Sequence, residues 1–271
     1  MEFFTRTKTQ TPPFIIINGT DFILCGNDYD THLWLKRDFI RQSTKFVISD
    51  LYGNLLAQYG ELFKSNGYDI KVLNTADYKN SAKYNPFAYI RDSNNVTKFV
   101  TAIINGTKGG GKTGDINFIS AETMLYEAII SYMKNEAMPE EQNIHMLLYT
   151  LQHMKPYKEN RETAVDLLFE YKEKEEPENF SLCQYKRFKN IAGKKGKYIV
   201  DSCINRLKPF DTVKMREFLS NDELDLKSLF WPPTALFVVG NNNGAVLDFL
   251  APLMYSQLFD ILYNKAAHEF I

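Results

Sequence analysis

The chain has 271 residues, of which 44% are apolar and 24% are charged. This length suits one core with a sizeable insertion, and the composition excludes an intrinsically disordered protein. The 32 Lys and Arg residues nearly balance the 33 Asp and Glu residues, so any contact with nucleic acid must come from a local patch.

The cysteines and the hydropathy pattern indicate the cellular compartment of the protein. Cys25, Cys183 and Cys203 are widely spaced without a CxxC pair, and the four histidines form no metal motif. This argues against a disulfide framework or a zinc site and favours a reducing cytoplasm. No stretch reaches the ~20 apolar residues that span a bilayer, and the start lacks the apolar core of a signal peptide. We therefore expect a cytoplasmic protein without bound metal or membrane span.

The first part of the chain alternates β-rich runs with helical spacing. Apolar runs at 14–17 and 22–24, KFVISD at 45–50 and YDIKVL at 68–73 predict strands, and residues 51–66 have the spacing of a helix. Strands that alternate with helices indicate βαβ units and a parallel sheet.

The pattern changes near Ser120, which we expect to cap a helix. Helical spacing then continues through 139–154, 162–174, 181–192, 196–208 and 212–219. TALFVV at 234–239 predicts a strand, and residues 246–266 predict a helix. We expect an α/β core of residues 1–118 and 230–271, with an all-α insertion of residues 119–229. The strand at 234–239 should lie next to the strand at 45–49, or one position away, because its buried backbone needs partners.

Several strings follow one another in an order shared with a known family. KFVISDLYGNLL at 45–56 is similar to a strand ending in DPKGEL, with Asp50, Gly53 and Leu55 retained. GYDIKVLN at 67–74, YNPF at 84–87, PEEQN at 139–143, YKRFKNIAGKKGKYIVDSCINRL at 185–207, DELDLKSL at 222–229, TALFVV and FLAPLMYSQLF follow. By their order from about Phe22 to Ala266, the chain resembles a divergent or truncated TraG/TraD-type coupling protein of type IV secretion systems.

The resemblance implies a RecA-like P-loop NTPase core with an inserted all-α domain that is associated with substrate recognition. In the family, this is a cytoplasmic hexameric motor at the inner membrane, which uses ATP and Mg²⁺. It receives relaxase–DNA complexes and feeds them to the secretion channel. The implied partners are therefore a relaxase or other transfer substrate, secretion components and further copies of the chain, at the inner face of the cell membrane.

The family's nucleotide site is degenerate in this sequence. Alignment back from KFVISD places the family's GKT at Tyr29, Asp30 and Thr31, and of the glycines only Gly26 is retained. An aspartate in place of the phosphate-binding lysine repels a triphosphate. The sequence also ends at Ile271 without the LDEF-like strand end that carries the Walker B acid. We therefore expect a noncatalytic chain that needs no cofactor.

A second string matches the P-loop pattern GxxxxGK[ST]. GTKGGGKT at 106–113 supplies Gly111, Lys112 and Thr113 at the required places. A true P-loop follows a strand and leads directly into a helix, whereas the next helix is expected only near Ser120. We expect a basic glycine-rich loop, and the P-loop remains the alternative.

Asp50, which ends a strand as a Walker B aspartate does, is expected to cap a loop.

A basic stretch and an acidic run mark candidate partner sites. Residues 186–197 hold six basic residues and no acidic one: Lys186, Arg187, Lys189, Lys194, Lys195 and Lys197. They would bind single-stranded DNA weakly and with salt dependence, with Tyr185, Phe188 and Tyr198 stacked on bases. The alternative is a solvated helix face with its aromatic side chains in the core. Acidic residues at 170–178 form either a solvated helix end or a docking site for a basic relaxase.

These observations predict a noncatalytic coupling-protein-like module of a conjugative DNA transfer system, which binds a transfer substrate or secretion components. One alternative is a nucleotide-dependent DNA-translocating motor that uses residues 106–113 or residues of another chain. The other is a relic without activity of its own. Nucleotide binding separates the motor from the other two, and partner capture by the helical insertion separates the module from the relic.

Overall fold

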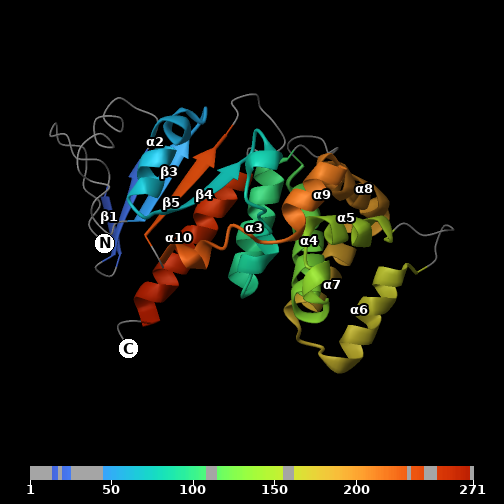
Figure 1. Cartoon of the computed structure of the whole chain (residues 1–271). Coiled ribbons are helices and arrows are strands. Elements are labelled where there is room, and N and C mark those ends of the chain that lie inside the picture. The colour runs from blue at the N-terminus through green and yellow to red at the C-terminus, as the bar shows by residue number, and fades with distance from the viewer. Residues whose placement is uncertain are drawn as a thin grey trace. The chain divides into compact units, whose positions relative to one another are not determined.

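The structure is a computed structural model (Figure 1) that describes residues 14–17, 20–25, 45–107, 115–154, 162–230, 233–240 and 249–268. The chain forms two compact units. Residues 1–84 and 223–271 form the first, here called the α/β unit, and residues 85–222 form the second, the helical unit. The helical unit is therefore an insertion, with boundaries at 84/85 and 222/223 where the sequence suggested 118/119 and 229/230.

The α/β unit contains a sheet with the strand order β1-β2-β3-β5-β4. β1 (Phe14–Ile17) pairs antiparallel with β2 (Thr20–Cys25). β3 (Lys45–Asp50), β5 (Thr234–Val239) and β4 (Asp69–Asn74) continue the sheet in parallel. β5 lies between β3 and β4, which confirms that the segments on both sides of the insertion form one sheet and that β5 neighbours β3.

The central strand β5 is a nearly continuous apolar run, as expected for a strand that is covered on both faces. Every residue of β5 is buried. On one face, helix α2 (Asn54–Ser65) packs Phe63 edge-to-face against Phe46 and Phe237, with ring centroids 5.0 and 5.7 Å apart. Helix α10 (Leu250–His268) contacts β1 and the 3-10 helix η7 (Leu226–Phe230). Another 3-10 helix, η2 (Tyr78–Asn80), follows β4.

The chain leaves and re-enters the α/β unit at one place. The carbonyl oxygen of Lys83 accepts hydrogen bonds from the backbone N–H groups of Glu223 and Leu224, both at 2.9 Å. The ammonium group of Lys83 also lies 3.4 Å from Glu223 Oε1. The two ends of the insertion are therefore fastened together just outside it.

The helical unit is organised around the long helix α4 (Ile116–Glu136), which packs against four other helices. These are α3 (Ser93–Gly106), α5 (Ile144–Gln152), α7 (Phe180–Ala192) and α8 (Gly196–Leu207). α6 (Ala164–Glu175) packs on α7, and α9 (Val213–Ser220) packs on α5. Short 3-10 helices complete the unit: η3 (Pro86–Tyr89), η4 (Pro139–Glu141), η5 (Gly193–Lys195) and η6 (Lys208–Phe210).

Side-chain caps fix where these helices begin, and one corrects the sequence prediction. Helix α4 begins at Ile116, not near Ser120, because Asp115 Oδ1 accepts the backbone N–H groups of Asn117 and Phe118 at 3.1 and 3.3 Å. Asn143 likewise starts α5, so the single helix expected at 139–154 is two elements.

Candidate functional site

The carboxyl edge of the parallel sheet holds one of the candidate residues, Asp50. β2 ends there at Cys25, and β3 ends two register positions further at Asp50. Asp50 is fully buried, and its Oδ2 accepts the backbone N–H of Leu56 in the first turn of α2 at 2.8 Å. Its Oδ1 has no hydrogen-bond partner among the described residues. The candidates Gly26, Asp30 and Thr31 lie outside the described ranges.

The turn after β3 explains why Asp50, Gly53 and Leu55 match the family's strand end DPKGEL. Asp50 caps α2 as described, and Gly53 takes φ +73°, a left-handed conformation that favours glycine. Leu55 is fully buried in the core under α2. Each of the three residues therefore has a structural role at the turn.

The glycine-rich string at 106–113 lies between two helices of the helical unit. Helix α3 runs to Gly106 and ends with Thr107 as its C-cap, and Asp115 then caps α4. A helix therefore precedes the string, whereas a P-loop needs a strand there. Gly111, Lys112 and Thr113 lie outside the described residues.

A buried ion pair anchors the start of that string. Arg206 on α8 donates from Nη2 to Glu122 Oε2 at 2.8 Å and from Nε to Glu122 Oε1 at 3.2 Å. Its Nη1 donates to the carbonyl oxygens of Thr107 and Ile104 at 2.5 and 3.2 Å. Arg206 thereby ties the last turn of α3 to α4 and α8.

The first half of the basic stretch is used inside the helical unit. Lys186 Nζ lies 2.5 Å from Glu173 Oε1, and Lys189 Nζ lies 2.7 Å from Asp166 Oδ1. Tyr185 and Phe188 are buried, so they cannot stack on bases. For these residues the structure favours the alternative of a helix face whose aromatic side chains belong to the core. The exposed Arg187 contacts Gln184.

The second half of the stretch is exposed where α7 turns into α8. We call Lys194, Lys195, Lys197 and Tyr198 the basic elbow. All four side chains are exposed, Tyr198 by 69%. Lys194 and Lys197 form no ion pair with any described residue, and the nearest acidic group to Lys195 is Asp115 at 3.9 Å. Within the described part of the chain, the elbow therefore offers available cations next to one accessible aromatic ring.

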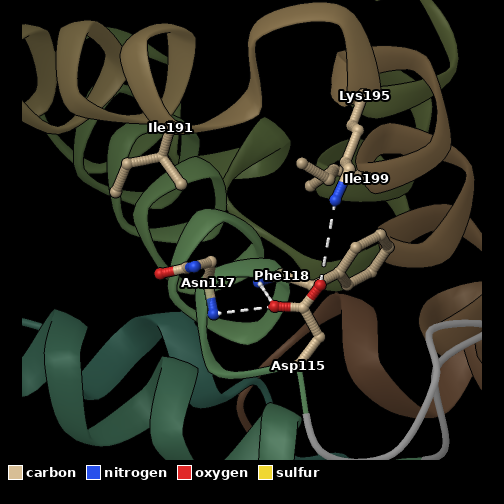
Figure 2. Close-up of a pocket in the computed structure, with 6 residues that line it drawn as sticks. All are labelled: Asp115, Asn117, Phe118, Ile191, Lys195 and Ile199. Atoms are coloured by element: carbon tan, nitrogen blue, oxygen red, sulfur yellow. Dashed lines mark hydrogen bonds and ion pairs between the residues drawn. The ribbon is translucent and has the colours of Figure 1, made fainter.

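A small pocket adjoins the elbow at the start of α4 (Figure 2). It is lined by Asp115, Asn117, Phe118, Ile191, Lys195 and Ile199. Figure 2 shows the carboxylate of Asp115 turned toward both its capped N–H groups and Lys195. Since Asp115 occupies the free N–H groups of α4, the cations available to an anionic ligand are those of the elbow.

The described residues form neither a metal-binding cluster nor a membrane-spanning helix. Among the described residues, no group of three or more His, Cys, Asp and Glu side chains is placed to hold a metal ion. Within the same ranges, no helix has both the length and the apolar character needed to cross a membrane.

These sites thus lie on a chain whose α/β unit is interrupted in sequence by an all-helical unit. The model of the family "Type IV secretory system Conjugative DNA transfer" matches residues 39–269, and the chain belongs to that family. No curated protein matches the chain. Among solved structures, the unbound monoclinic form of the bacterial conjugative coupling protein TrwBdeltaN70 matches with 13% identity and a TM-score of 0.48. The match covers 95% of this chain and 56% of that one.

The sequence missed two residues that organise these sites. Asp115 was not expected as a cap, although an aspartate just before an apolar helical run is a known start signal. Arg206 lies in the family-like string at 185–207, and its partner Glu122 is 84 positions away in the sequence. No spacing rule connects residues at that separation.

Proposed function

We propose that the chain is a noncatalytic coupling module of a conjugative type IV secretion system, which binds the transfer substrate through its helical unit. Membership of the conjugative DNA transfer family supports the part of the proposal that places the chain in a conjugative system. The observation that carries the noncatalytic part is helix α3, which runs to Gly106 directly before the P-loop-like string. A P-loop aims backbone amides at phosphate by linking a strand to a helix, and this string links two helices.

Two acidic residues, one known from the sequence and one from the structure, support the same proposal. Asp30 stands where the family's pattern has a lysine, and Asp50 uses one carboxylate oxygen to cap α2. Two acidic side chains without a matching lysine give a triphosphate no compensating charge.

The isolated chain should therefore bind ATP no tighter than about 1 mM, or about −4 kcal/mol, and should not hydrolyse it. A titration of fluorescent ATP analogue with Mg²⁺ tests this on the parent and on Lys112→Ala. Micromolar binding that Lys112→Ala abolishes would establish the alternative, a motor that uses residues 106–113. Micromolar binding that survives the change would place the nucleotide at another site and would equally refute the noncatalytic proposal.

The basic elbow is the surface through which the module would contact the DNA of its substrate. Lys194 and Lys197 have no acidic partner among the described residues, so phosphates need not displace such an ion pair to reach them. Tyr198 offers an exposed ring, and one base stacked on an aromatic ring contributes roughly 1–3 kcal/mol. The near-neutral chain has no global field to hold DNA, so this local patch must supply the attraction.

We expect Lys194→Glu/Lys195→Glu to weaken binding of single-stranded DNA by roughly tenfold or more at low salt. The slope of log affinity against log salt should become shallower by roughly 0.7 for each phosphate that the variant no longer neutralises. Both side chains are exposed, so the melting temperature should not fall. Fluorescence anisotropy with a labelled oligonucleotide measures both the affinity and its salt dependence.

The matched control is Lys214→Glu/Lys227→Glu, which changes the net charge equally at exposed positions on α9 and η7. If this control weakened binding as much as the elbow variant, the attraction would be nonspecific and the elbow would have no special role. A parent chain that binds no DNA even at low salt would refute the elbow as a DNA site.

A further inference from the structure

The outward face of helix α6 carries exposed apolar side chains that the described helical unit leaves uncovered. Leu167, Leu168 and Tyr171 are 53%, 42% and 61% exposed. Tyr171 lies three and four positions after the two leucines, so the side chains adjoin on one face. Single exposed apolar residues are ordinary on a protein surface, whereas adjacent ones mark interaction sites. We call these three residues the α6 stripe.

The opposite face of α6 is held by α7, which gives the stripe a fixed orientation. Phe169 stacks on Tyr185 with ring centroids 4.0 Å apart. Asp166 accepts hydrogen bonds from Tyr185 Oη and Lys189 Nζ, both at 2.7 Å. Burial alone would raise the pKa of Asp166, but hydrogen bonds from Lys189, Tyr185 and Thr163 outweigh it and hold that pKa below its usual range. The carboxylate therefore stays ionised and keeps α6 in place near neutral pH.

The stripe has an acidic surround. Residues 162–178 contain seven acidic and two basic side chains, and Lys186 and Lys189 of α7 pair with Glu173 and Asp166, which leaves a net charge of −3. Two exposed acidic side chains belong to the same helix as the stripe: Glu175 accepts a hydrogen bond from Tyr171 Oη at 2.6 Å, and Glu170, which lies between Leu168 and Tyr171 in the sequence, pairs with Lys174 at 3.4 Å. Such a surface repels nucleic acid and anionic lipid. A partner surface that complements the α6 stripe would be apolar at its centre and basic at its rim.

We propose that the α6 stripe docks a basic amphipathic helix of a protein partner. Apolar anchors of that helix would cover Leu167, Leu168 and Tyr171, and its Lys or Arg residues would face Glu170 and Glu175. A second copy packed symmetrically on the same face would bring acidic groups against acidic groups, which disfavours self-association there. This inference rests on the proposed function, since it names the chemistry of the protein part of the substrate that the module receives.

A synthetic peptide is a suitable probe, built from leucine and lysine with the leucines at helical spacing and labelled with a fluorophore. The full chain should bind it, and Leu168→Ser/Tyr171→Ser should weaken binding by roughly tenfold or more, as removal of central apolar anchors does. The matched control Tyr149→Ser/Val213→Ser removes exposed apolar side chains from α5 and α9 and should change the affinity by less than about twofold. Circular dichroism checks that each variant is folded.

Three results would overturn the inference. The parent chain could bind a scrambled peptide of the same composition equally well, or not bind the amphipathic one at all. The stripe variant could bind like the parent. Sedimentation could show that the parent self-associates and that the stripe variant does not, which would make a second copy the occupant. The stripe variant should keep full affinity for single-stranded DNA, so failure here is distinguishable from failure of the elbow as a DNA site.

Discussion

Replacing Arg206 with methionine should lower the free energy of unfolding of the helical unit by about 3–5 kcal/mol. The substitution leaves the fully buried carboxylate of Glu122 without its counter-charge. It also removes the donor for the carbonyl oxygens of Thr107 and Ile104. The large cost arises because an unpaired charge remains buried, not because the intact pair is itself strongly stabilising.

The placement of the two tryptophans allows this effect to be assigned to one unit. Trp34 and Trp231 both fall within the sequence ranges of the α/β unit, 1–84 and 223–271, and residues 85–222 contain no tryptophan. Arg206→Met should therefore shift urea unfolding followed by far-ultraviolet circular dichroism more than unfolding followed by tryptophan fluorescence. A circular dichroism midpoint equal to that of the parent would contradict the prediction.

Two variants serve as controls for the buried pair. Glu122→Met/Arg206→Met removes both charges and should be more stable than Arg206→Met alone, since no unpaired charge stays buried. Arg216→Met breaks the exposed ion pair with Asp211, 2.7 Å long, and should cost less than about 1 kcal/mol. If Arg216→Met cost as much as Arg206→Met, burial would not be the deciding factor.

The sequence predicted the elements better than the units that they build. The sequence predicts the bounds of β3 and β5, because the apolar core of each strand is flanked by polar residues or by Pro and Gly. The residues of helix α3 lie within 1–118, which the sequence pattern places in the α/β core. Its buried residues Val96, Phe99 and Ile103 instead belong to the helical unit. The boundary at 84/85 falls within the YNPF string, which has no flexible linker to announce it.

Charge counting overestimated the basic surface for a similar reason. Six basic residues follow one another without an acidic neighbour in sequence, but α6 brings Glu173 to Lys186 and Asp166 to Lys189 across 13 and 23 positions. The cations that remain are those at the turn between α7 and α8. A one-dimensional pattern shows which charges are present, and only the packing of helices shows which are already paired.

The α/β unit has its own sensitive position, Phe63 on α2. Phe63→Ala should destabilise this unit by about 3–5 kcal/mol, since it deletes a fully buried ring and leaves a cavity at the centre of the core. The ring makes edge-to-face contacts with Phe46, Tyr68 and Phe237 at centroid distances of 5.0, 5.1 and 5.7 Å. Those contacts add to the cost of losing the buried area.

Unfolding in urea, followed by tryptophan fluorescence, should show the effect of Phe63→Ala more strongly than circular dichroism does, the reverse of the order for Arg206→Met. The adjacent Leu62 is the matched control: it lies on the same helix but is 43% exposed, so Leu62→Ala should cost less than about 1 kcal/mol. If the two substitutions shifted the fluorescence midpoint equally, the ring of Phe63 would not be the centre of this core. If Phe63→Ala moved both probes equally, the two units would unfold as one cooperative body, because loss of the sheet would then remove the support that the helical unit needs.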